Sequence, residues 1–377
     1  MAAKKKPISS GKKIQSSNGE VPKGRRAVII GGVRTPFVRA FGEFMLLDTI
    51  ALAGVATKAL LDKTQVPRSE LDGIVWGGVI LPTLSPNIAR EVALDLKLPA
   101  GVEGYTVTRA CASGLQAITD AVSAIERGDA DVLIAGGSDS TSNAAVALPN
   151  KAVHALAPLA FGKAKGMQDY LGVLAQLMPL SDIMPSMPKI AERTTGEVMG
   201  ESAEKMARRN GITRQEQDAL AARSHRLAAA AVSSGRFESE VIPVETSKGW
   251  VHADTIIRGD TSEEKLAKLR PVFAKDGTVT AGNATPLTDG ASCILLMSEE
   301  KAEALGFTGL AAFRSWSYVG VDPTDQLLIG PAIAMPRALE RAGMELGDVD
   351  LVDIHEAFAA QVLSVTKAME SKAFSEE

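Results

Sequence analysis

The chain has 377 residues, of which 45% are hydrophobic and 23% are charged, a composition typical of a globular protein with a large buried core. Its formal net charge of −4 argues against a nucleic-acid-binding protein, and its two cysteines cannot form a disulfide framework. No apolar run reaches about 18 residues, so we expect no transmembrane helix. We expect a reducing compartment, which is the cytoplasm or, in a eukaryote, the mitochondrion.

The first 26 residues differ from the rest because lysines and arginines face a single acid, Glu20. We predict a disordered basic tail over residues 1–26. A mitochondrial transit peptide is the alternative, but such peptides favour arginine and an amphipathic helix. Lysines beside Pro7, Gly11 and Gly19 disfavour that alternative.

Strand-like and helical segments alternate from residue 27 onward. Apolar, β-branched stretches indicate buried strands, and apolar residues spaced by three or four indicate helices. Strands are predicted at Ala27–Gly32, Gly73–Ile80, Gly104–Thr108, Asp131–Gly137 and Ala291–Met297, and helices at Thr49–Asp62, at Ile88–Leu96 and from Cys111 to a stop at Gly128. The alternation predicts an α/β fold with a mostly parallel sheet.

Residues 150–275 are richer in Met, Leu, Ala and Pro, and a capping box at Thr213 and Glu216 predicts a helix start there. We interpret this segment as a helical loop domain inserted into a first half made of residues 27–149 and 276–297. The density of leucine and methionine at 151–187 predicts contact with a partner or a membrane surface. An apolar tunnel explains the same composition, and the sequence does not separate the two.

The segment Ala59–Val75 resembles the segment Arg337–Asp353 at an offset of 278 residues. This internal repeat predicts two related α/β halves, of which residues 298–377 form the second. We expect that half to contain two helices and two strands, near Ala311–Val319 and Val349–Ile354.

The same offset aligns Gly77 with His355 and places the counterpart of Cys111 beyond residue 377. We therefore expect the second half to be incomplete and its sheet to lack later strands. Loss of buried side chains worth roughly 1.5–3 kcal/mol each predicts that the chain alone aggregates or stays partly unfolded.

Cys111 follows a predicted strand and begins a predicted helix, where unpaired backbone N–H groups and the helix dipole favour a thiolate. Ser113 and Gly114 keep the first turn small. A cysteine at such a position is either a nucleophile or a small core residue. Cys293 lies inside an apolar strand-like run, so we predict that it belongs to the core.

His355 occupies the same kind of strand-to-helix switch in the other half, where open α/β sheets collect ligands. Packing of the two halves would bring it to the pocket of Cys111, where an imidazole can donate to a developing oxyanion. A plain helix cap is the alternative. His154, His225 and His252 have no partner at metal-ligand spacing, so we assign no metal.

The segment Gly277–Ser292 is rich in Gly, Thr and Asn, a composition that permits close backbone approach to a ligand. A loop before a strand is the simpler interpretation. The chain has neither a phosphate-binding Gly-Lys-Ser/Thr loop here nor a G-x-G-x-x-G dinucleotide motif.

These motifs together resemble the thiolases, most closely the degradative 3-ketoacyl-CoA thiolases of the trifunctional-enzyme β-subunit type. The resemblance covers nearly the whole chain after the basic tail and runs in family order through the segments RTPFVRAFGEF, TRACASGLQAI, VMGESAEKMA, GTVTAGNATPLTDGA and HEAFAAQ. It implies a five-layered α-β-α-β-α fold of two related halves with an inserted loop domain.

The resemblance also implies site residues and an activity. Cys111 matches the acylated nucleophile, and His355 matches a position that holds the thioester oxygen. Met199, Ala281 and Thr285 match positions that line the coenzyme A groove, and Phe358 flanks the pocket. The implied reaction cleaves a 3-ketoacyl-CoA with coenzyme A as a substrate, in fatty acid β-oxidation, with no permanently bound cofactor. The implied partners are acyl-CoA, further copies in a homodimer or tetramer, and a hydratase–dehydrogenase α subunit.

Thiolases also carry a Gly-His-Pro segment and a second catalytic cysteine in a glycine-rich loop, and neither occurs in these 377 residues. We therefore expect family membership without ordinary turnover by this chain. The alternatives are an acetoacetyl-CoA-forming thiolase, a condensing enzyme that uses an acyl carrier protein, and a non-catalytic lipid-binding or scaffold subunit.

Overall fold

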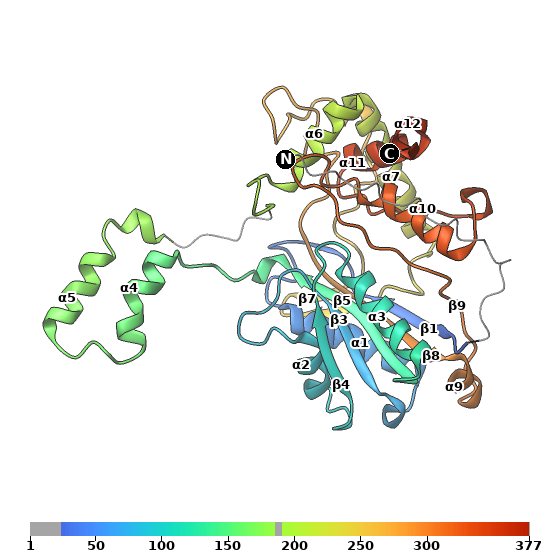
Figure 1. Cartoon of the computed structure of the whole chain (residues 1–377), viewed down its shortest axis with the longest axis horizontal. Helices are drawn as coiled ribbons and strands as arrows, with labels where there is room; N and C mark the ends of the chain where they lie inside the picture. The colour runs from blue at the N-terminus through green and yellow to red at the C-terminus, as the bar shows by residue number, and fades with distance from the viewer. Residues whose placement is uncertain (1–23, 185–190, 377) are drawn as a thin grey trace, which may run out of the picture.

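The computed structural model describes residues 24–184 and 191–376, so most of the predicted basic tail lies outside the described residues. One large mixed sheet with the strand order β4-β3-β5-β8-β1-β9 dominates the fold (Figure 1). Its strands are β1 (Ala27–Arg34), β3 (Gly73–Gly77), β4 (Glu103–Val107), β5 (Val132–Ser140), β8 (Thr288–Ser298) and β9 (Ala311–Ala312), and β2 (Val38–Arg39) pairs with β8.

The predicted strands of the first half are confirmed, with small changes in their ends. The expectation of a mostly parallel sheet is wrong. Only β3 runs parallel to its two neighbours, whereas β8 is antiparallel to both β5 and β1. The long strand β8 arrives from the inserted segment rather than from a crossover helix, so no parallel geometry is imposed on it.

Alternate residues of the strands face two separate apolar clusters. Ile74 and Trp76 of β3 pack with helices α1 (Thr49–Thr64) and α2 (Ile88–Asp95) on one face of the sheet. Val75 packs with α3 (Ser113–Arg127) on the other face. The period of two thus gives the sheet two apolar faces, and the first turn of α3 lies against Gly77 at the end of β3.

The inserted segment has two parts. Helices α4 (Asn150–Ala160) and α5 (Met167–Gln176) form a hairpin that extends away from the body (Figure 1), followed by the turn η3 (Leu180–Ile183). The second part lies on the body and contains α6 (Met199–Asn210), α7 (Arg214–Ser233), β6 (Val244–Thr246), β7 (Gly249–Val251) and α8 (Glu263–Leu266). Thr213 caps α7 and Glu216 completes the predicted capping box.

The last part of the chain contains α9 (Glu299–Ala304), α10 (Gly330–Ala342), α11 (Ala359–Glu370) and α12 (Lys372–Glu376). The two strands predicted for this part of the chain are mostly not formed. Only Ala311–Ala312 of the first is a strand, and Val349–Ile354 is not a strand at all. Extended chain becomes a strand only beside a hydrogen-bonding neighbour, and the described residues give Val349–Ile354 none.

Candidate active site

Cys111 lies in a tight turn between β4 and α3, two residues before the helix begins. Arg109 and Cys111 form an isolated bridge across the turn, and Ala110 between them has a φ of +43°. The Ser113 hydroxyl donates to the Ala110 carbonyl at 2.6 Å and accepts from the Arg109 N–H at 2.8 Å. A non-glycine residue with such a φ costs of order 1–3 kcal/mol, so the surrounding contacts must hold the turn.

Gly77 at the end of β3 lets this turn approach the sheet. A Cβ on Gly77 would lie 2.4 Å from the Ser113 carbonyl carbon and 2.7 Å from the Gly114 nitrogen. Backbone atoms cannot yield to such contacts as a flexible side chain can. The strand therefore needs glycine at the position where it supports the first turn of α3.

The two cysteines differ as predicted in their surroundings. Cys111 is exposed, whereas Cys293 is only 3% exposed within β8. Burial raises the pKa of the Cys293 thiol far above its usual range because the apolar interior disfavours a thiolate. Of the two, Cys111 is the one that a substrate can reach.

The glycine-rich segment folds into a loop held by buried polar groups. The buried carboxylate of Glu204 on α6 accepts from the N–H groups of Thr278 and Val279, each at 2.8 Å. The Asn283 amide donates to Asp218 on α7 at 2.9 Å, and its oxygen accepts from the Thr280 N–H at 2.8 Å. The loop is thus fixed from within rather than free to fray.

This loop pairs with the segment before α11. The Thr285 N–H donates to the Ala357 carbonyl at 3.0 Å, and the Ala359 N–H donates to the Asn283 carbonyl at 2.9 Å. Phe358 is buried in one cluster with Met199, and its ring meets Phe273 edge-on at 6.1 Å. The structure therefore brings together Met199, Thr285 and Phe358, while Ala281 lies exposed in the same loop.

His355 is exposed and follows the unpaired extended segment. Among the interactions of residues 24–184 and 191–376, no hydrogen bond joins it to another residue, and neither of the two cavities described below is lined by His355 or Cys111. The expected proximity of these two residues stays a prediction.

A cavity of about 190 Å³ lies beside the loop, between α7 and the segment before α8. Thr285 lines it, together with Ser224, His225, Arg258 and Glu356, which the sequence did not single out. The Ser224 hydroxyl donates to a Glu356 carboxylate oxygen at 2.6 Å. Because His225 and Arg258 are 33 positions apart, no local spacing reveals them as partners.

Arg258 contacts both ring nitrogens of His225. Its backbone N–H lies 3.3 Å from His225 Nδ1, and its guanidinium nitrogen Nη2 lies 3.0 Å from Nε2. Both groups of Arg258 can only donate, so the imidazole accepts from Arg258 and holds its side chain at the cavity. Burial, and then the charge of Arg258, lower the pKa of His225.

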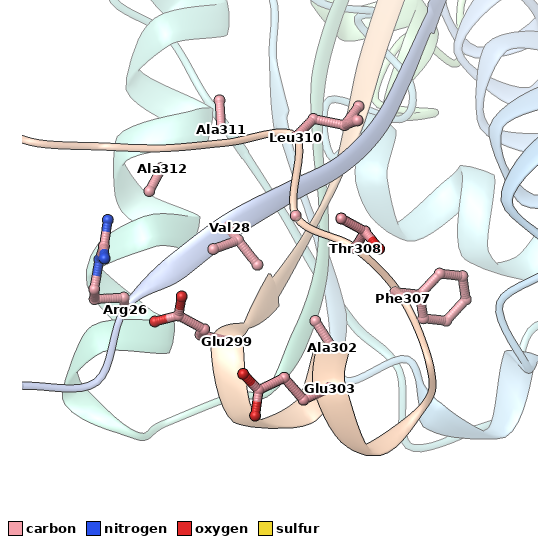
Figure 2. Close-up of a pocket in the computed structure, with 11 residues that line it drawn as sticks. Arg26, Val28, Glu299, Ala302, Glu303, Phe307, Thr308, Leu310, Ala311 and Ala312 are labelled. Carbon is pink, nitrogen blue, oxygen red and sulfur yellow. The ribbon is translucent and has the colours of Figure 1, made fainter.

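A larger cavity of about 440 Å³ lies at the edge of the sheet formed by β1 and β9, between β1, α9 and residues 307–312 (Figure 2). Its charged lining residues are Arg26, Glu299 and Glu303, and none of the predicted site residues borders it. The described part of the chain contains no group of three or more His, Cys, Asp or Glu side chains placed to hold a metal ion. Within the same residues, no helix combines the length and the apolarity needed to span a bilayer.

Comparison with known proteins identifies the family. Residues 27–300 match the model of the thiolase N-terminal domain, and residues 307–375 match that of the thiolase C-terminal domain. The chain belongs to the thiolase family, and both domains of the family are represented in it.

Curated relatives and solved structures agree with that assignment. The 3-ketoacyl-CoA thiolase of Aliivibrio fischeri is 43% identical over 357 residues, which are 94% of this chain and 80% of that protein. The 3-ketoacyl-CoA thiolase of Pseudoalteromonas translucida is 40% identical over 361 residues, 95% of this chain and 82% of that protein.

Two crystal structures show the same fold. The acetyl-CoA acetyltransferase of Bacillus anthracis superposes with a TM-score of 0.79 at 35% identity, covering 93% of this chain and 84% of that one. Human mitochondrial 3-ketoacyl-CoA thiolase in complex with CoA also has a TM-score of 0.79, at 30% identity and the same coverage. The fold is the thiolase fold, and the family supports acetyl-CoA C-acyltransferase activity.

Proposed function

We propose that the protein cleaves 3-ketoacyl-CoA thioesters by thiolysis through an acyl-Cys111 intermediate. The observation that carries the proposal is the exposed Cys111 thiol on a strained turn at the beginning of a 15-residue helix, in a chain of the thiolase family. The N-terminus of such a helix stabilises a thiolate, which is the nucleophilic form of cysteine.

The reaction balances in two steps. The Cys111 sulfur attacks the C3 carbonyl, the C2–C3 bond breaks, and the departing enolate of acetyl-CoA takes up a proton. The thiol of coenzyme A then loses a proton and attacks the acyl thioester, which releases Cys111 and the shortened acyl-CoA. Covalent capture divides one difficult cleavage into two easier steps. We assign His355 to the oxyanion site, on the basis of its place in the family motif.

We propose that coenzyme A binds along the loop that carries Ala281 and Thr285, with Met199 and Phe358 forming its apolar side. Support comes from the packing of Met199 with Phe358 and from the cavity beside Thr285. The guanidinium of Arg258, which lines this cavity, suits a phosphate oxygen of the nucleotide portion.

A matched pair of substrates tests that assignment. Arg258→Gln is expected to weaken binding of coenzyme A by about tenfold, the effect of one charge-assisted hydrogen bond. Binding of pantetheine, which lacks the phosphates, should stay unchanged. Equal loss for both ligands would contradict the placement of phosphate at Arg258.

We also propose that the protein serves fatty acid β-oxidation, as a member of the trifunctional-enzyme β-subunit type with a hydratase–dehydrogenase α subunit as its partner. The names of the curated relatives support the substrate class. We propose a homodimer or tetramer, located in the cytoplasm or, in a eukaryote, in the mitochondrion. Co-purification with the α subunit and sedimentation of the full chain test these proposals.

We also propose that the tip of the α4–α5 hairpin binds an anionic membrane surface. Phe161 and Met167 are 77% and 75% exposed there, beside the exposed Lys163 and Lys165. Apolar side chains flanked by lysines suit the headgroup region of a bilayer that carries negative charge.

We propose an acyl-binding subunit as a second candidate, in which Cys111 is acylated without turnover. An acetoacetyl-CoA-forming thiolase is the other candidate, and the length of the preferred acyl chain separates it from a degradative enzyme.

Rapid mixing of the full chain with a 3-ketoacyl-CoA, followed by intact-protein mass spectrometry, tests the central proposal. Wild type and Cys293→Ala should gain one acyl group, and Cys111→Ser should gain none. Acylation of Cys111→Ser, or none of wild type, would show that the proposed nucleophile is wrong. When coenzyme A is then added, a single burst of acetyl-CoA without continued release favours an acyl-binding subunit. Comparison of acetoacetyl-CoA with a longer substrate decides the acyl class.

A further inference from the structure

Tyr318 reaches from the second half of the chain onto the helix that follows Cys111. Its hydroxyl lies 2.7 Å from the hydroxyl of Thr119, which is buried on α3. The Thr119 hydroxyl donates to the Gln116 carbonyl at 3.1 Å. Either hydroxyl can donate in the contact between Thr119 and Tyr318, and the contact ties the tyrosine to α3.

Arg109 covers the ring of the same tyrosine. Its guanidinium carbon lies 4.4 Å from the centroid of the Tyr318 ring, within the range of a cation–π contact. Its Nε donates to the Gln116 side chain at 2.6 Å, and Gln116 in turn donates to Asp120 at 2.5 Å. The guanidinium is thus held between the first turns of α3 and a ring from the second half.

The backbone of Arg109 belongs to the turn of Cys111. It bridges to Cys111 and donates to Ser113, and the strained Ala110 lies between the two bridged residues. The turn is therefore held on one side by the Ser113 hydroxyl. On the other side it is held through Arg109, whose side chain contacts Gln116 and the Tyr318 ring. A turn in a sparsely populated conformation persists only when its surroundings hold it.

We propose that Arg109 and Tyr318 are positioning residues that hold the Cys111 turn in its strained form and so keep the thiol at the N-terminus of α3. The inference concerns the chemical reactivity of the Cys111 thiol. Only its consequence for catalysis rests on the proposed function. Without the clamp, Ala110 relaxes to an unstrained φ and the sulfur moves away from the unpaired N–H groups of the helix. The thiolate is then less favoured and less reactive at neutral pH.

The measurement is the rate of Cys111 alkylation by iodoacetamide between pH 6 and 10, read by peptide mass mapping of the full chain. Buried Cys293 should stay unlabelled as long as the protein is folded. Tyr318→Leu removes both ring and hydroxyl, and its matched control Tyr318→Phe keeps the ring under Arg109. Arg109→Gln removes the charge, and Arg109→Lys keeps a charge without the planar group or the Nε contact.

Tyr318→Leu is expected to slow alkylation at pH 7 by about five- to tenfold and to move the midpoint of the pH profile upward, since a misplacement of about 1 Å can cost a reactive group about a hundredfold in rate. Tyr318→Phe should stay within about twofold of wild type, because the ring contact is retained. Arg109→Gln and Arg109→Lys should both resemble Tyr318→Leu.

Two results would overturn the inference. One is an unchanged pH profile in Tyr318→Leu. The other is wild-type behaviour of Arg109→Lys, which would show that positive charge alone suffices. If Tyr318→Leu does not melt cooperatively, the two variants of the exposed Arg109, Arg109→Gln and Arg109→Lys, test the inference instead. Failure of wild type to be acylated by a 3-ketoacyl-CoA would reject the proposed function and leave the alkylation result intact.

Discussion

Gln65 and Gly343 occupy equivalent places in the two halves of the chain, at the offset of 278 residues given by the sequence repeat. Both adopt the left-handed conformation, with φ of +56° and +65°, and they end α1 and α10. Each is followed by a short 3₁₀ turn, η1 (Arg68–Glu70) and η4 (Leu346–Asp348). The repeat is therefore real in three dimensions up to the point where β3 begins in the first half.

Gly343 offers a clean test of that cap. Nothing lies within 4 Å of a Cβ at Gly343, so Gly343→Ala adds only the backbone strain of a positive φ. We expect a loss of about 1 kcal/mol of unfolding free energy in urea titrations. Gly347→Ala, which also meets open space but has no positive φ, serves as the control and should change stability little. Equal effects of the two substitutions would contradict the assigned conformation.

Gly77→Ala should disturb both stability and the Cys111 turn. The new Cβ would meet the Ser113 carbonyl and the Gly114 nitrogen below 3 Å, and overpacking of this kind costs about 1–3 kcal/mol. We expect a lower urea midpoint together with slower alkylation of Cys111. Gly114→Ala lies in the same contact but faces open space and should retain wild-type stability. A fully stable Gly77→Ala would show that β3 and α3 lie further apart than described.

Asn283 is expected to be the most sensitive position of the loop beside the cavity. Asn283→Ala leaves the buried Thr280 N–H without its acceptor and Asp218 without one donor, a loss of about 2–3 kcal/mol. Asn283→Asp should be worse, because it places a second carboxylate beside Asp218. Thermal melts of the two variants rank their stabilities. The affinity for coenzyme A should fall in the same order. A reversed order would exclude the hydrogen bond to Asp218.

Burial of Cys293 should make the free energy of unfolding depend on pH in the alkaline range. Its pKa is raised in the folded state, so the unfolded chain loses the thiol proton first, near its ordinary pKa of about 8.5. Above that pH the folded state binds more protons than the unfolded state, and unfolding free energy falls by about 1.4 kcal/mol per pH unit. Below it the contribution of the buried thiol is fully present.

Urea titrations from pH 8 to 10.5 test this dependence by comparing wild type with Cys293→Ala. The variant starts less stable, because a buried sulfur is removed, but its stability should decline less steeply with pH. Because the two proteins differ only at residue 293, the difference between their curves reports on Cys293. Parallel curves would mean that Cys293 ionises alike in the folded and unfolded states.

The α4–α5 hairpin should control binding to charged vesicles. Phe161→Ser combined with Met167→Ser is expected to reduce cosedimentation with phosphatidylserine-containing vesicles by about tenfold or more, given about 1.5–3 kcal/mol for each buried side chain. Leu84→Ser removes an apolar residue that is 97% exposed elsewhere and should have no effect. Vesicle binding that survives the double substitution, with loss of binding to the α subunit instead, would assign the hairpin to the partner protein.

Much of this protein is determined by local sequence. The apolar, β-branched run GIVWG predicted a buried strand, and Gly128 predicted the end of α3, where it adopts a φ of +82°. The surroundings of Cys111 and Cys293 in the chain predicted which thiol is exposed. Each of these features depends on residues within a few positions of one another, so periodicity and backbone preference suffice.

Tertiary structure alone decided the rest. Val349–Ile354 has the composition of a strand and remains unpaired, because a strand also needs a hydrogen-bonding neighbour. The antiparallel direction of β8, the pairing of His225 with Arg258 and the contact of Arg109 with Tyr318 join positions from 33 to more than 200 residues apart. Such contacts depend on how the chain closes its long loops, and no local pattern of side chains encodes that closure.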